Sequence, residues 1–162
     1  MGFSPIAQLH FRQLGEREGV LNTPAFRGCE PQNGLRPLVT CYCMIQKIVL
    51  SEKLDKITHH FQPAIVGEVS GCHVKLVKFN GEFLWHSHPN EDEMFLVLEG
   101  SFVMRLRDGD IRLDRGEFLI VPAGVEHMPV AESEVSILLF EPTSTVNTGD
   151  AGGDRTVTPE SI

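Results

Sequence analysis

The sequence predicts an all-β protein, either a sandwich or a closed barrel, and two observations carry this prediction. Short runs rich in Val, Ile, Leu and Phe recur along the chain, and tight-turn signals such as Asn80-Gly81 and Asp108-Gly109 separate them. Many short apolar strands with little helix between them are typical of sandwiches and barrels. A chain of 162 residues has room for one such domain.

Seven strands and one helix are expected. The strand ranges, each rich in apolar residues and bounded by turn residues, are 64–69, 72–79, 94–98, 101–107, 110–113, 117–121 and 135–140. Within 101–107, Phe102, Met104 and Leu106 alternate with residues of the opposite face, which predicts one core face and one largely solvated face. The helix is expected at 52–58, with Ser51 as its N-cap.

The chain divides into three parts. Residues 1–43 show no sustained strand or helix period and are punctuated by Gly and Pro, so we expect an irregular, poorly ordered N-terminal extension. Met44 opens the barrel domain, 44–142, and we expect translation to begin there; the alternative is a genuine arm that packs on a partner subunit. Residues 143–162, rich in Thr, Ser, Asn, Gly and Asp, are expected to form a surface tail.

Composition excludes several classes of function. The 14 basic and 22 acidic residues give a net charge of −8, which argues against binding to nucleic-acid phosphates. No apolar run approaches the roughly 20 residues of a membrane span, and no secretory signal is visible. We therefore expect a soluble, cytoplasmic protein. Reduced thiols are expected at the four cysteines, none of which forms a Cys-x-x-Cys pair: Cys29, Cys41, Cys43 and Cys72.

Two histidines and a glutamate lie close together in the sequence. On an extended strand His86 and His88 project from one face with Cα atoms about 6–7 Å apart, so both imidazoles can reach one ion. The next strand begins near Glu93, which shares a face with Phe95 and Val97. A His-x-His pair alone is more often a surface or core feature. Glu93 is more informative, because it starts an apolar strand where an unpaired carboxylate would be costly to bury.

A third histidine follows a second turn. The strand expected to end at Pro122 is followed by Gly124, which permits a sharp reversal, and then by His127. Three imidazoles and one carboxylate match the ligand preferences of Fe, Mn, Ni, Co, Cu or Zn rather than Ca or Mg. Four protein ligands on a six-coordinate ion leave two positions for water, substrate or dioxygen.

With these two elements the sequence resembles the cupin superfamily. The first cupin motif, with four residues rather than five between its Gly and first His, is matched by Gly81, His86, His88, Glu93 and Gly100. The second motif, whose final Asn is Ala131 here, is matched by Gly116, Pro122, Gly124 and His127. The resemblance covers about residues 60–141. The segment Glu141-Pro142 followed by Asn147-Thr148-Gly149 is similar to that of small single-domain bacterial cupins of unsettled function.

The resemblance implies a jelly-roll barrel of six to eight strands, usually a homodimer, with one divalent transition metal inside. It implies as ligands His86, His88, Glu93 and His127. With a divalent ion this set keeps a net charge of +1, which attracts an anionic oxygen of a small molecule. We expect a metal-dependent enzyme acting on a small oxygenated metabolite, of the oxygenase, isomerase or lyase type; the alternatives are a non-catalytic binding or sensing module and a barrel with vestigial metal.

The strand phases predict which side chains surround that site. They place Phe102 in the core and suggest three pocket residues, Phe95, Met104 and Phe118. Candidate proton-transfer groups are His73 and Lys75. Ordinary alternation would point Val74 and Leu76 inward, so we expect His73 and Lys75 to face solvent.

Overall fold

The computed structural model describes residues 45–162. The irregular extension, the start at Met44 and the partner-binding arm all lie outside the described residues. One short helix and eight strands follow: α1 Leu50–Leu54, β1 Ala64–Val69, β2 Cys72–Glu82, β3 Glu93–Glu99, β4 Ser101–Leu106, β5 Ile111–Asp114, β6 Phe118–Val121, β7 His127–Pro142 and β8 Glu160–Ser161. The predicted all-β class with one short helix is confirmed.

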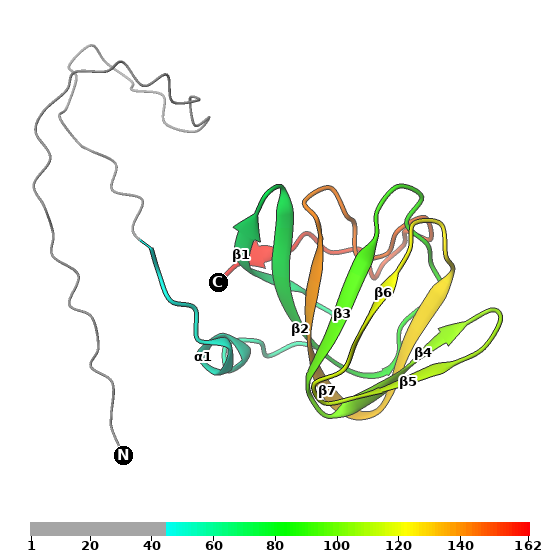
Figure 1. Ribbon diagram of the computed structural model, residues 1–162, viewed down its shortest axis with the longest axis horizontal. Coiled ribbons are helices and arrows are strands. Elements are labelled where there is room, and N and C mark those ends of the chain that lie inside the picture. The colour runs from blue at the N-terminus through cyan, green and yellow to red at the C-terminus, as the bar shows by residue number, and fades with distance from the viewer. Residues whose placement is uncertain (1–44) are drawn as a thin grey trace, which may run out of the picture. The chain divides into compact units, whose positions relative to one another are not determined.

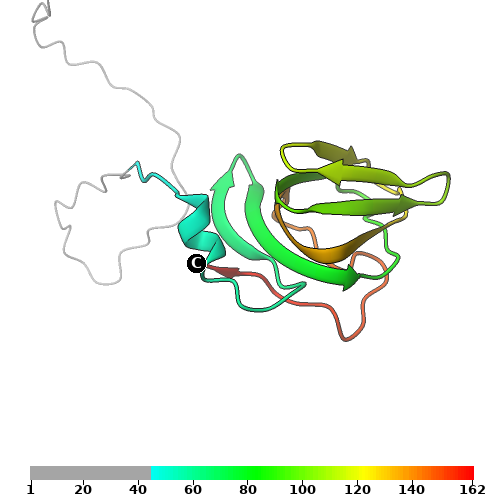
Figure 2. The same cartoon turned by 90° about the horizontal axis from the view of Figure 1, so that it is seen from below.

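The strands form one curved sheet that wraps around a core (Figures 1 and 2). Its main path runs β5-β4-β7-β2-β1-β8, and β3 joins it by pairing with β7 on one side and β6 on the other. The long strand β7 is therefore central, because its start pairs with β4 and its later part pairs with both β2 and β3. It brings the second sequence motif beside the first.

Two apolar clusters occupy the two faces of this sheet. The interior cluster, which fills the barrel, contains Val77 and Phe79 of β2 together with Phe95, Phe102 and Met104. The outer cluster lies on the opposite face of β2, where Leu76 packs with residues of and after α1. Phe102 and Met104 are thus in the core, as predicted.

The helix begins earlier than expected. It spans Leu50–Leu54 rather than 52–58, and its N-cap position is Val49, which provides no side-chain hydrogen bond. Ser51 lies inside the helix and does not cap it. Leu54 is buried in the outer cluster, so packing of this short apolar turn on the sheet stabilises it in place of a cap.

The prediction that Lys75 faces solvent is wrong. Its side chain is 1% exposed and lies on the barrel face of β2 with Val77 and Phe79. Alternation was a poor guide because β2 is covered on both faces: Val74 and Leu76 point to the outer cluster, not inward. His73, on the same face as Lys75, is half-buried rather than solvated.

Phe118 also differs from the prediction, since it is 61% exposed and cannot line an inner pocket. In the β3–β6 ladder Glu93 pairs with Val121 and Phe95 with Leu119, so the inward residues of β6 are Leu119 and Val121. Four consecutive apolar residues make up β6, and such a strand does not reveal its phase in the sequence.

Residues 143–162, expected as a surface tail, are packed against the barrel. Thr148 is fully buried, and Glu160–Ser161 adds strand β8, parallel to β1. Figure 2 shows this segment running along one side of the barrel before it reaches β1. Among the described residues no helix is long and apolar enough to cross a membrane.

Candidate metal centre

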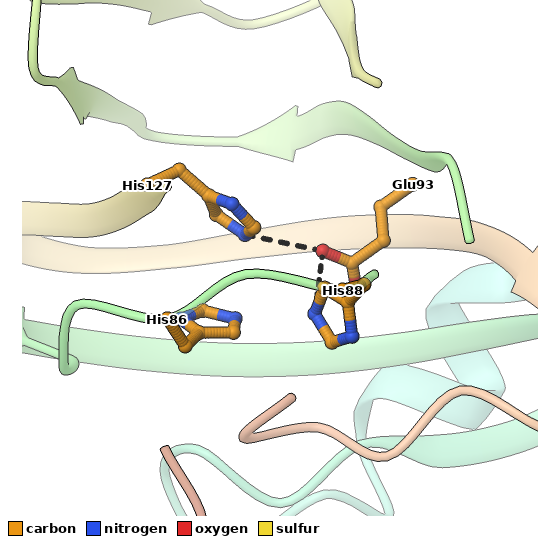
Figure 3. Close-up of side chains that lie close together, drawn as sticks. All are labelled: His86, His88, Glu93 and His127. Carbon is orange, nitrogen blue, oxygen red and sulfur yellow. Dashed lines mark ion pairs between the residues drawn. The ribbon is translucent and has the colours of Figure 1, made fainter. Parts of the chain in front are cut away.

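The four predicted ligands meet at one point inside the barrel (Figure 3). Each of His86, His88, Glu93 and His127 offers one ligand atom, and these atoms all lie within 4.8 Å of one another. The two motifs are held together by backbone hydrogen bonds, because His86 N–H donates to His127 O (3.1 Å) and His127 N–H to His86 O (2.9 Å). Glu93 is the first residue of the neighbouring strand β3.

Local backbone contacts aim two of the imidazoles. Nδ1 of His86 lies 3.0 Å from Leu84 O, and Nδ1 of His127 lies 3.0 Å from Val125 O. Because a carbonyl can only accept, each Nδ1 carries the proton, and each Nε2 presents a lone pair to the cluster. Fixing the outer nitrogen in this way is how proteins usually orient a metal-binding histidine.

The cluster has the unsatisfied atoms that a metal ion would satisfy. Nε2 of His88 and Nε2 of His127 each lie 3.1 Å from Oε2 of Glu93. All three atoms are buried and lack a hydrogen bond of acceptable geometry among the described residues. Buried polar atoms are rarely left so, because each costs about 1–3 kcal/mol. A divalent transition ion bound by three nitrogens and one oxygen would remove this cost.

The pKa values of His86 and Glu93 are shifted in directions that favour cation binding. Burial, and then the neighbouring His127, lower the pKa of His86 to about 4, so its ring is uncharged at neutral pH. Burial alone would raise the pKa of Glu93, but the imidazoles of His127 and His88 beside it hold that pKa well below its ordinary value. His86 therefore presents a neutral imidazole and Glu93 an ionised carboxylate, the forms that bind metal.

A turn after β7 holds the backbone between His86 and His88. Ser87 N–H donates to Asp150 Oδ1 (2.7 Å), and Asp150 N–H donates to Ser87 O (3.0 Å). Gly149 sits against this pair with φ +50°, and a Cβ there would lie 2.1 Å from Ser87 O. The motif Asn147-Thr148-Gly149 is recognisable in the sequence but does not predict this role for Gly149.

Replacing Gly149 by alanine is expected to weaken metal binding about 10- to 100-fold, the range typical of residues that orient ligands. Gly152→Ala is the matched control, since Gly152 also has a positive φ (57°) but its Cβ would meet nothing within 4 Å. Both variants place alanine at a positive φ and share that strain, but only alanine at position 149 would contact Ser87. Equal metal affinities of the two variants in a titration would contradict the proposed role of Gly149 in positioning Ser87.

A small cavity adjoins the cluster. It has a volume of about 50 Å³, and its wall includes His86 and Glu93 beside apolar side chains. Phe95 lies in this wall, whereas Met104 is buried in the core and is not part of it. Of the three predicted pocket residues, the structure brings only Phe95 to the cavity.

A buried ion pair lies beside the cluster and was not foreseen. Lys75 Nζ lies 2.5 Å from Glu141 Oε1, and the side chains are 1% and 2% exposed. Burial, and then the hydrogen bond and negative charge of Glu93, raise the pKa of Glu141, and the ammonium of Lys75 opposes this rise. Glu141 Oε2 is buried without a hydrogen bond among the described residues, and Glu141 lines the cavity.

Known proteins are similar to this chain in fold and in sequence. The family model described as a cupin domain matches residues 74–141. A solved cupin-2 domain protein from Shewanella frigidimarina is 40% identical, with TM-score 0.58, over 59% of this chain and 93% of its own. The chain belongs to the cupin superfamily. A Neisseria meningitidis structure is similar to this cupin with 31% identity and TM-score 0.57, over 60% of this chain and 100% of its own.

Curated relatives match only in part. This cupin is 38% identical over 63 residues to the uncharacterized protein YdbB of Bacillus subtilis, which is 38% of this chain and 56% of that protein. It is 38% identical over 68 residues to the tetracenomycin polyketide synthase protein TcmJ of Streptomyces glaucescens, which is 40% of this chain and 44% of that protein. The chain spans about half the length of the curated relatives it matches.

Proposed function

We propose that this cupin is a cytoplasmic, metal-dependent enzyme that acts on a small oxygenated metabolite by oxygenation, isomerisation or elimination. Its ion, one of Fe, Mn, Zn, Ni, Co or Cu, is held by His86, His88, Glu93 and His127. The observation that carries this proposal is the set of buried, unsatisfied nitrogen and oxygen atoms that converge at the wall of a cavity.

The chemistry follows from charge and access. A divalent ion with three neutral imidazoles and one carboxylate keeps a net charge of +1, so it acidifies a bound water or hydroxyl and attracts an anionic oxygen. His86 and Glu93 border the cavity, so a molecule there can approach the ion. Glu141, which borders the same cavity, is a group able to hold or release a proton close to such a molecule.

A second candidate function is a non-catalytic module that binds or senses a small molecule. It is favoured by the cavity wall, which is mostly apolar side chains and so suits binding without turnover. The presence of Glu141 at the wall favours the enzyme instead, because simple binding does not require a buried carboxyl group.

Metal analysis and turnover separate these candidates. Purified protein is expected to contain about one transition metal ion per chain by elemental analysis. The protein is then loaded with Fe(II) and, separately, with the other candidate ions, and a metabolite panel is followed by oxygen uptake and by product formation. Turnover with any metal supports the enzyme. Tight metal with ligand binding but no turnover supports the module, and no metal at all contradicts both.

We further propose that this cupin is a homodimer through the outer face of β6 and β3. Phe118 and Ile120 are 61% and 57% exposed there, and they pair with Leu96 and Met94 on β3. These four side chains form a contiguous apolar patch of the kind that marks an interface.

The variant Phe118→Lys/Ile120→Lys is expected to convert the dimer into a monomer, as measured by light scattering during size-exclusion chromatography. Ile111→Lys serves as the control, because Ile111 is also exposed (46%) but lies on β5, which does not pair with β6. A monomeric unmodified protein, or a dimer that the double variant leaves intact, would rule out this interface.

A further inference from the structure

We propose that the cavity selects a small aromatic compound that carries a hydroxyl group, a phenol, with its ring among the phenylalanines and its hydroxyl donating to Glu141. This inference rests on the proposed function, because His86 and Glu93 of the metal cluster form part of the polar end of the cavity. It adds the substrate class, which neither the cluster nor the fold specifies.

The wall favours a flat apolar body. Four phenylalanines line the cavity: Phe61, Phe79, Phe83 and Phe95. The ring of Phe61 stacks on Phe79 with centroids 5.6 Å apart and on Phe83 at 5.3 Å, so these side chains form a continuous aromatic surface. The Arg155 guanidinium lies 5.5 Å from the Phe61 ring and holds this surface from the segment after β7. Aromatic rings pack favourably against one another beyond the area they bury.

The polar end favours a hydrogen-bond donor. The polar wall residues are His86, Glu93, Glu141 and Asn147. Two of them are carboxyl groups, which can accept a hydrogen bond from a hydroxyl. Glu141 Oε1 is occupied by Lys75, whereas Oε2 is buried and has no hydrogen bond among the described side chains and backbone. An acceptor left free at a cavity wall is satisfied by a ligand that donates to it.

The cavity volume of about 50 Å³ limits the ligand. Since about 10–15 Å³ on this measure holds one water molecule, the cavity has room for about three to five water molecules. A single ring with one small substituent is therefore the size that the interior accepts, and a larger molecule would have to keep its remaining part outside.

The test compares three probes on protein loaded with Zn(II): phenol, cyclohexanol and anisole. Binding is followed by protein NMR chemical shifts, which report millimolar as well as tighter Kd values, and metal content is measured on the same samples. Phenol is expected to bind about 2- to 10-fold more tightly than cyclohexanol, which lacks the aromatic ring. It is expected to bind at least about 10-fold more tightly than anisole, which cannot donate a hydrogen bond.

Variants assign these preferences to residues. In Glu141→Gln the Lys75 ammonium, which can only donate, holds the amide oxygen, so the amide NH₂ replaces Oε2. The preference for phenol over anisole should then disappear, whereas the exposed carboxylate variant Glu134→Gln should retain it. Phe83→Leu should remove the preference for phenol over cyclohexanol, whereas Phe118→Leu, on the outer face, should not.

The outcomes distinguish this inference from the function on which it rests. Zn(II)-loaded protein that shows no preference for phenol overturns the substrate class and leaves the metal centre standing. If the protein binds no metal ion, the proposed function is wrong. The preference of that metal-free protein for phenol over cyclohexanol and anisole then tests the substrate class separately. If Glu141→Gln does not fold, the unmodified protein and Phe83→Leu still decide. A missing preference for phenol over cyclohexanol in the unmodified protein, or a preference that persists in Phe83→Leu, contradicts the proposal.

Discussion

Replacing Glu141 by leucine is expected to lower the free energy of unfolding of the metal-free protein by about 3–5 kcal/mol at pH 7. The substitution leaves the Lys75 ammonium, which is 1% exposed, without its carboxylate partner inside the barrel. A buried unpaired charge is among the most costly defects in a folded protein, because the lost hydration is no longer offset. Urea unfolding followed by fluorescence or circular dichroism measures the difference.

The reverse substitution should cost less, and this asymmetry is the sharper part of the prediction. In Lys75→Met, Glu141 can take the uncharged form at pH 7, because burial and Glu93 raise its pKa and Lys75 no longer opposes them. A carboxyl group whose pKa is raised on folding loses stabilisation as pH rises from its unfolded value toward the folded one. The cost of Lys75→Met should therefore grow as the pH rises above 7, because only the unmodified protein has Lys75 to stabilise the charged carboxylate.

The double variant Lys75→Met/Glu141→Leu completes a double-mutant cycle with the two single variants. It replaces the ion pair by apolar side chains of similar size and is expected to be about as stable as the unmodified protein, or more stable. The exposed pair Arg107–Glu126 is the control, and its double-mutant cycle should give a much smaller coupling, because solvent screens an exposed pair. Additive losses at Lys75 and Glu141 would show that the two side chains do not form a coupled buried pair.

Replacing His127 by alanine is expected to abolish stoichiometric metal binding. His127 is fully buried, its Nε2 lies 3.1 Å from Glu93 Oε2, and Val125 O fixes its ring. Its removal takes away one of the four proposed ligands and leaves a space in its place. The affinity for Zn(II) or Co(II) should therefore fall more than about 100-fold. This loss exceeds the effect of about 10- to 100-fold typical of a residue that only orients a ligand. Elemental analysis after dialysis against a metal buffer measures the remaining ion.

His60→Ala is the matched control for this variant. His60 is exposed and pairs with Glu134 (2.7 Å), far from the cluster in the sequence and on the surface, so its loss should leave one ion per chain. The metal should also raise the Tm of the control but not that of His127→Ala, since a ligand stabilises only the protein that binds it. Full metal occupancy in His127→Ala would exclude His127 as a ligand.

The parts of the fold that follow from local pattern were predictable from the sequence. Strand β1 matches its predicted bounds, and the shared face of Glu93, Phe95 and Val97 follows from strict alternation with partly exposed neighbours. The convergence of the four candidate ligands required the resemblance as well, because the meeting of His127 with His86 depends on how β7 runs beside the first motif.

The errors at Lys75 and Phe118 arise because apolar neighbours in a strand do not reveal which face of the strand points inward. Lys75 was placed in water because its neighbours Val74 and Leu76 are apolar, yet the outer cluster buries those neighbours and the barrel buries Lys75. Phe118 was placed inside from the strand phase, although every residue of β6 is apolar and such a sequence does not reveal its phase. In both cases the missing information was which face of the strand lines the barrel.

Residues after β7 were also outside the reach of local pattern. Gly149 and Asp150 act by packing on Ser87, 62 and 63 residues earlier in the chain, and no periodicity encodes such a contact. A polar, glycine-rich composition indicates a loop but does not reveal what the loop holds.

Anomalous diffraction from crystals of the Zn(II)-loaded protein tests the central claim most directly. One peak is expected inside the barrel, about 2.0–2.2 Å from a nitrogen of each of His86, His88 and His127 and from a carboxylate oxygen of Glu93. A fully occupied ion elsewhere in the molecule, or one of these four side chains turned away from the peak, would contradict it.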